Sequence, residues 1–215
     1  MGDERKSSVV VIVASVGMIV TMIFHPHGRV TPAQLESMIR VNLATHALAL
    51  VSTALLFLGA LGIAKWLGGP DRLGVAGLVL FGFAAAAVMN AGMLNGLVAP
   101  QLMRNIVAAA DETRNSWKLI LDYNFSVNQA FAKVYAVGAG LAIAVWSVAI
   151  WKRRQGAVGI AVYGCILGAV AVAGIFSGLL RTDVHGFQML VFGQAIWFLL
   201  VAGKMWNEGK SEVTT

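Results

Sequence analysis

The amino-acid sequence predicts an all-α, polytopic membrane protein: one integral membrane domain over residues 1–215, a six-transmembrane-helix bundle built from helical hairpins. The chain is 58% hydrophobic and only 12% charged, and its mean hydropathy of +0.77 is far above that of soluble domains. Its apolar residues form runs of about 20, the length that crosses a bilayer as a helix. Its basic residues flank those runs, which indicates topology signals and a lipid bilayer as partner, with no nucleic acid.

The first predicted span covers residues 7–24. A secretory signal peptide would look similar, but no small-x-small cleavage site precedes the His-Pro-His sequence around Pro26, so we expect an uncleaved helix. Pro26 ends this helix, because the residue before a proline is pushed out of helical geometry. Thr31 and Pro32 then predict a new helix, as N-cap and first helical residue, whose apolar part runs over 41–66.

Four more spans are predicted, over residues 73–97, 134–151, 156–180 and 186–206. A long polar insertion, residues 98–133, separates the third span from the fourth. Apolar residues such as Leu102 and Ile106 recur there on one helical face, and Arg104 and Asp111 oppose them. We therefore expect an amphipathic segment that lies on the outer membrane surface and caps the bundle.

Lysines and arginines assign the two sides of the membrane, because cytoplasmic loops carry an excess of them. With the N-terminus inside, nine basic residues fall at the inner ends, and the short outer loops hold only Arg29, Arg40 and Arg181. We therefore expect an inner-membrane protein with both termini in the cytoplasm. A tryptophan also ends each helix that reaches the inner side, as an aromatic belt requires: Trp66, Trp151 and Trp206.

Two predicted spans align with each other without a gap. Residues 74–97 and 156–179 share five glycines in register, and two other spans each carry a histidine at the same distance before a lysine. These matches predict helical hairpins in parallel repeat. Both aligned segments also carry a Gly-x-x-x-Gly seam, typical of close packing within one bundle and, less often, of homo-oligomers.

Polar side chains gather at one end of the predicted bundle. Asn42, His46 and Thr53 share one face of the second span, and asparagines recur at the outer ends of the next two. Polar groups in hydrocarbon are costly unless they face the bundle interior or a wet cavity. We therefore expect a polar vestibule at the outer face, formed by Asn42, Asn90, Asn95, Asn124, Asn128, Asp183 and Gln188.

The four histidines, His25, His27, His46 and His185, belong to the same end and leave three interpretations open. The first is that neighbouring groups satisfy them as ordinary interfacial or core residues. The second is ligation of a transition metal or haem, since imidazole is a common ligand and His46 and His185 are expected at similar depth. The third is proton-linked transport through the vestibule.

Recognisable catalytic machinery is scarce. The sequence has no G-x-S-x-G elbow, no phosphate-binding glycine loop and no intramembrane carboxylate pair, so catalytic residues stay unknown. We expect an inner-membrane protein with a histidine-containing site at its periplasmic face, binding a metal or haem for redox or hydrolytic chemistry. The alternative is a small proton-linked transporter or a non-catalytic partner in a membrane assembly.

Overall fold

The computed structural model describes residues 2–26, 32–68, 72–153 and 157–211, and all regular structure in these ranges is helical. Within the described residues, six helical stretches are long and apolar enough to cross a membrane, which confirms the all-α membrane fold. The long helices are α1 (Asp3–Ile23), α2 (Leu35–Trp66), α3 (Leu73–Met93), α5 (Asp111–Arg153), α6 (Val158–Phe176) and α7 (Val184–Ser211). The short elements are the 3-10 turn η1 (Pro32–Gln34), the π-helical turn η2 (Leu94–Val98) and α4 (Ala99–Ala108).

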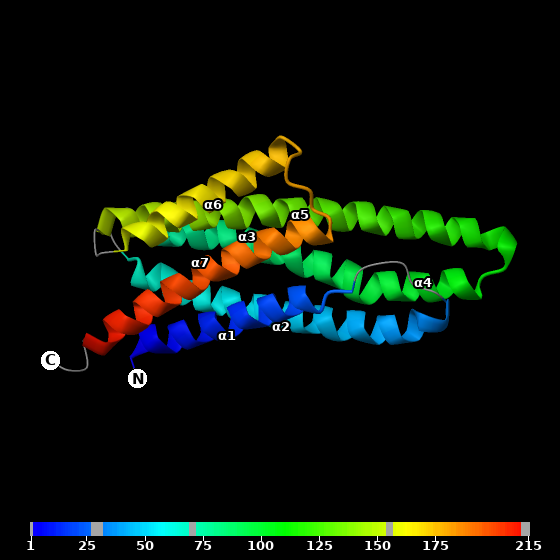
Figure 1. Cartoon of the computed structure of the whole chain (residues 1–215), viewed down its shortest axis with the longest axis horizontal. Coiled ribbons are helices and arrows are strands. Elements are labelled where there is room, and N and C mark those ends of the chain that lie inside the picture. The colour runs from blue at the N-terminus through cyan, green and yellow to red at the C-terminus, as the bar shows by residue number, and fades with distance from the viewer. Residues whose placement is uncertain (1, 27–31, 69–71, 154–156, 212–215) are drawn as a thin grey trace.

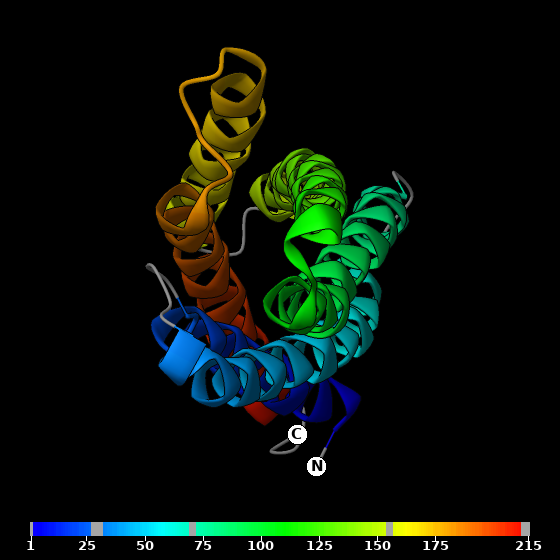
Figure 2. The same ribbon diagram turned by 90° about the vertical axis from the view of Figure 1, so that its right-hand side faces the viewer.

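The helices follow one another around a ring (Figure 2). α1 packs on α2, α2 on α3, α3 on α5 and α5 on α6, and the ring closes where α7 packs on α1. Both termini therefore lie at the same end of the bundle, as an even number of crossings requires (Figure 1). We call this the inner end and the opposite one the outer end, following the charge-based prediction of orientation.

The outside of the ring is apolar. Large hydrophobic side chains are exposed on it, among them Val75 and Phe83 of α3 and Ile166 and Val170 of α6. A soluble protein would not leave faces of this kind in water, whereas the hydrocarbon of a bilayer matches them. The fold therefore suits an integral membrane protein.

Aromatic side chains fill the inner half of the ring. The rings of Trp146 and Trp197 stack with centroids 6.0 Å apart and planes 8° apart. Buried indole N–H groups need acceptors; Trp146 donates to the Gly74 carbonyl at 3.0 Å and Trp197 to the Ser147 hydroxyl at 3.1 Å. Glycine is required at position 77, because a β-carbon there would overlap the Trp146 ring.

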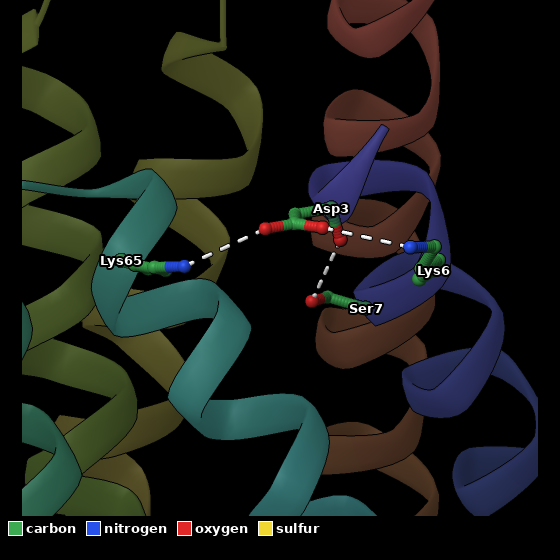
Figure 3. A network of polar contacts seen from close by, with 4 residues as sticks. All are labelled: Asp3, Lys6, Ser7 and Lys65. Carbon is green, nitrogen blue, oxygen red and sulfur yellow. Dashed lines mark hydrogen bonds and ion pairs between the residues drawn. The ribbon is translucent and has the colours of Figure 1, made fainter. Parts of the chain in front are cut away.

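At the inner end, α1 and α2 are joined by exposed ion pairs (Figure 3). The Asp3 carboxylate lies 3.7 Å from the Lys6 ammonium and 3.6 Å from that of Lys65 on α2. The Ser7 hydroxyl donates to the Asp3 carbonyl at 3.0 Å. Exposed ion pairs contribute little individually, so these contacts orient the helix ends more than they hold the bundle together.

The predicted outer cap is not confirmed. Residues 98–133 do not form a separate surface-lying segment: η2 and α4 continue α3 to Ala108, and α5 is one unbroken helix of 43 residues. α4, the first half of α5 and the start of α2 instead extend the bundle along its long axis (Figure 1). Of the charges that interrupt the apolar pattern, Arg104 of α4 pairs across helices, donating to both Glu36 carboxylate oxygens of α2 at 2.9 and 2.8 Å, whereas Asp111 pairs with Arg114 within α5.

Several predicted spans are only parts of longer helices. The apolar run 41–66 is only the later part of α2, and 134–151 is the C-terminal part of α5. Pro100 lies in the first turn of α4, directly after the π-helical turn η2, and the helical stretch continues through it to Ala108. The Thr31 cap falls outside the described residues.

The predicted parallel repeat is also wrong. Gly77 packs against Trp146, whereas a β-carbon added to its counterpart Gly159 would meet nothing within 4 Å. Gly96 lies against His46, whereas its counterpart Gly178 follows the end of α6 with φ +73°. Matching glycines thus meet unrelated neighbours, so the alignment reflects the glycine-rich composition of two apolar helices.

Gly77 and Gly159 make a matched pair for a stability test. We expect Gly77→Ala to lower the unfolding midpoint of the detergent-purified protein, because overpacking a filled core costs about 1–3 kcal/mol. Gly159→Ala should leave the midpoint unchanged or raise it. Circular dichroism on heating measures both, and equal behaviour of the two variants would contradict the packing of α3 on Trp146.

The orientation can be tested on the two ends of α5. In a Cys165→Ser background, Glu112→Cys should react with a membrane-impermeant maleimide in intact cells, because the basic residues place it outside. Lys152→Cys should react only after permeabilisation. Labelling of Lys152→Cys in intact cells would reverse the assignment of inner and outer ends.

Candidate functional site

Two adjoining cavities occupy the outer half of the ring. The deep cavity, about 100 Å³, is lined from α1, α2, α3, α5 and the start of α7. The outer cavity, about 380 Å³, lies above it between α2, α4 and α5. The two share five lining residues, His25, Asn95, Asn128, Gln129 and Val184. The two adjoining cavities therefore extend from the outer end toward the middle of the bundle, where the sequence predicts a vestibule.

His25 and His46 meet at this opening. His46 is buried on α2, and His25 follows the end of α1, with the two ring centroids 5.0 Å apart in an edge-to-face arrangement. Each ring uses Nδ1 toward a backbone carbonyl: His46 toward Asn42 at 2.8 Å and His25 toward Pro26 at 3.1 Å. A carbonyl only accepts, so Nδ1 is the donor in both of these bonds.

Two buried oxygen atoms on the deep cavity have no hydrogen-bond partner among the described residues. They are Thr21 Oγ1 and Asn128 Oδ1, on side chains that are 2% and 9% exposed. An unpaired buried polar atom costs about 1–3 kcal/mol. Both residues line the same cavity as His25 and His46.

The π-helical turn η2 shapes the wall opposite His46. π turns are rare and gather at functional sites, and this one presents backbone carbonyls that accept from asparagines of two other helices. Asn42 Nδ2 donates to the Asn95 carbonyl at 2.7 Å, and Asn124 Nδ2 donates to the Leu94 carbonyl at 3.4 Å. A β-carbon at Gly96 would overlap His46. η2 therefore fixes the depth and rotation of His46.

The lining is rich in acceptors and poor in positive charge. Within the described chain, no lysine or arginine lines either cavity, and Asp183 is the one carboxylate, at the outer cavity. Amide and hydroxyl oxygens without a neighbouring positive charge suit a cation or a ligand rich in N–H and O–H donors. The electrostatics therefore disfavour an anionic ligand.

The predicted site residues divide into three groups. His25, His46, Asn42, Asn95, Asn128 and Asp183 line one or both cavities. Two support the walls: Asn124, through Leu94, and Gln188, whose Nε2 donates to the Met22 carbonyl at 3.2 Å. Asn90 is exposed and donates to Ala86 on its own helix, and His185 is exposed on the first turn of α7 and lines neither cavity. His27 lies outside the described residues.

Other cavity residues were not predicted. Gln129, whose Oε1 accepts from the Thr182 hydroxyl, lines both cavities. Met18 and Met22 are four residues apart, so the helical period alone places this pair on one side of α1. That spacing in the sequence could have predicted that these residues share one side of α1.

Comparison with protein families, curated proteins and solved structures finds no match to this chain. In the described ranges, no group of three or more His, Cys, Asp or Glu side chains is placed to hold a metal ion. Fold and site define a helical membrane protein with an acceptor-lined cavity around paired histidines.

The unpaired oxygen of Asn128 allows a stability test with a neighbouring control. We expect Asn128→Leu to raise the free energy of unfolding by about 1–3 kcal/mol, because it removes a buried acceptor that has no partner. Asn124→Leu, one turn earlier on the same helix, should lower it, because it removes the hydrogen bond from Asn124 Nδ2 to the Leu94 carbonyl. Thermal unfolding in detergent compares the two, and a destabilised Asn128→Leu variant would show that Oδ1 is satisfied in the ligand-free protein.

Proposed function

We propose that this protein binds a transition-metal ion between His25 and His46, at a site open to the periplasmic side of the inner membrane, for redox or hydrolytic chemistry. The observation that carries the proposal is the state of the two imidazoles. Both rings direct Nδ1 to a backbone carbonyl, and the ring centroids lie 5.0 Å apart. Metal-bound histidines typically donate their other ring N–H in this way, which sets ring orientation and tautomer.

The geometry suits a single ion better than haem. Two axial imidazoles of a haem lie on opposite faces of the porphyrin, with metal–nitrogen bonds of about 2 Å each. Rings in edge-to-face contact leave no space for a porphyrin between them. Two nitrogens on one ion lie within roughly 4 Å of each other, which adjacent rings of this kind can reach.

Two histidines leave coordination positions open. A water or a substrate would take them within the deep cavity, which Thr21 and Asn128 also line. An open position is the feature that separates reactive metal sites from structural ones. The outer cavity gives such a substrate access from the outer end.

The second candidate, proton-linked transport, has one specific observation in its favour. Below the deep cavity, past Met18, lies a small cavity of about 10 Å³, where Tyr135 donates to Gln194 Oε1 at 2.6 Å. Ser15 Oγ and Gln194 Nε2 line it and have no partner among the described residues. The space is about one water molecule in size, so it would be a stepping point for protons along the bundle axis.

Metal binding by purified variants tests the first candidate. The wild-type protein in detergent should bind one Zn²⁺ or copper ion, measured by titration calorimetry and elemental analysis. His25→Ala and His46→Ala should each weaken metal binding by about tenfold or more. Each variant removes one of the two nitrogen ligands, and losing even a residue that only supports a ligand typically weakens metal binding by about tenfold or more. His185→Ala is the matched control and should bind normally.

Three alternative results would contradict the metal site. A metal-free wild type that drives proton flux into liposomes would favour the transporter. Equal loss in all three variants would point to a folding defect. A loss confined to His185→Ala would move the site away from the cavity.

A further inference from the structure

A separate cavity of about 300 Å³ lies at the inner end of the bundle, between the end of α2, the start of α3 and the end of α5. We call it the inner cavity. Basic side chains from two of these elements line it: Arg72, Lys152 and Arg153. The described part of the lining contains no aspartate or glutamate, so its charge is positive. Small residues account for the space: Ala64, Gly68, Gly74 and Ala149.

Arg153 is held in place at this cavity by the end of α2. Its Nη1 donates to the Trp66 carbonyl, and its guanidinium carbon lies 5.2 Å from the centroid of the Trp66 ring. A guanidinium carries five N–H donors in a planar fork that matches two oxygens of a phosphate. The contacts with Trp66 therefore fix the position of Arg153 without using the whole fork.

Arg72 borders the same cavity in an unusual backbone conformation. It has φ +54°, in the left-handed region that favours glycine, directly before the first residue of α3. The next three residues, Leu73, Gly74 and Val75, also line the cavity. Their N–H groups have no partner within the helix and form the positive end of its dipole. Side chains and backbone of α3 thus add positive charge on the side of the cavity that faces Arg153.

Basic residues at the inner end also serve as topology signals. That role requires only the correct side of the membrane, and Lys6 and Lys65 fulfil it while pairing with Asp3. It does not require that the start of α3 and the end of α5 bring their arginines to one cavity. The arrangement of Arg72 and Arg153 therefore calls for an anion.

We propose that the inner cavity binds the phosphate of an anionic phospholipid, with Arg72 and Arg153 as its main partners. Basic pockets between transmembrane helices on the cytoplasmic side are suited to such headgroups. The site lies at the opposite end of the bundle from His25 and His46, so the proposal is independent of the metal site.

The surface beside the cavity favours a lipid over a free phosphate. Val75 lines the cavity, and Val79 and Phe83 follow it at intervals of four residues on one face of α3, all three more than half exposed. This apolar stripe gives an acyl chain a surface directly beside its headgroup, whereas a free phosphate would not use it. Trp151, also more than half exposed, precedes Lys152, and tryptophan is typical of the headgroup level.

The test measures lipid binding to the full-length protein in a neutral detergent by native mass spectrometry. The probes are phosphatidylglycerol, phosphatidylcholine of the same acyl chains, and inorganic phosphate in excess as a competitor. We expect the wild type to bind phosphatidylglycerol about tenfold more tightly than phosphatidylcholine, because each basic residue near the membrane surface contributes about fivefold toward an anionic lipid. Inorganic phosphate should not displace the lipid.

Two double variants locate the site. Arg72→Gln/Arg153→Gln should weaken phosphatidylglycerol binding by about tenfold or more and leave phosphatidylcholine binding unchanged. Lys6→Gln/Lys65→Gln is the matched control, because it removes the same charge at the same end of the bundle, away from the inner cavity. It should keep the wild-type preference. Arg72→Lys/Arg153→Lys keeps the charge and should retain most of that preference.

Three results would overturn the lipid site. An unchanged preference in the arginine-to-glutamine variant, or an equal loss in the lysine variant, would show that the inner cavity does not select the lipid. Displacement of phosphatidylglycerol by inorganic phosphate would identify a soluble anion as the ligand. A wild type that does not distinguish the two lipids would exclude the site without any variant, so a variant that fails to fold leaves the test decisive.

Discussion

The satisfaction of buried polar groups is the constraint on which this bundle depends. A hydrocarbon surround offers no hydrogen bonds, so polar side chains inside a membrane helix must find partners within the protein. In the centre of the ring, Tyr135 donates to Gln194 and Trp146 donates to the Gly74 carbonyl, so both buried donors have a partner. Apart from Arg5 Nε at the inner end, the unpaired buried atoms among the described residues all border cavities along the bundle axis: Ser15, Thr21, Asn128 and Gln194. The exceptions thus mark where the interior accommodates something other than protein.

Helix α5 connects the two halves of the molecule. Its inner half presents alanines that are fully buried, which lets neighbouring helices approach closely and brings Trp146 into the centre of the ring. Its outer half presents Asn124, Asn128 and Gln129 to the cavities and to η2. One rigid helix therefore sets the packed core and the polar site at a fixed distance from each other, so the site is held by the core rather than by loops.

Two irregularities in the helices produce the site itself. α1 stops just before the His25-Pro26 pair, which frees His25 to turn toward α2. α3 loosens into the π turn η2, which exposes carbonyls to Asn42 and Asn124 and leaves room for His46 beside Gly96. Regular helices at both positions would close the space that the histidines share. Local departures from ideal geometry are costly, and here both occur at the same depth, around one cavity.

The sequence by itself determined the class of the protein and the depth of its polar residues. Apolar run length and the placement of lysine and arginine are properties of short segments, and counting along a helix of constant rise locates a residue relative to the membrane. Counting residues cannot reveal rotation about a helix axis. It therefore predicted that His46 and His185 act together because they lie at equal depth, whereas packing brings His25 beside His46. Nor could it reveal that Arg104 and Glu36 pair across helices and so permit α4 and α5 to extend beyond the apolar runs. Those outcomes depend on side chains from different helices meeting, and only the tertiary structure decides which ones do.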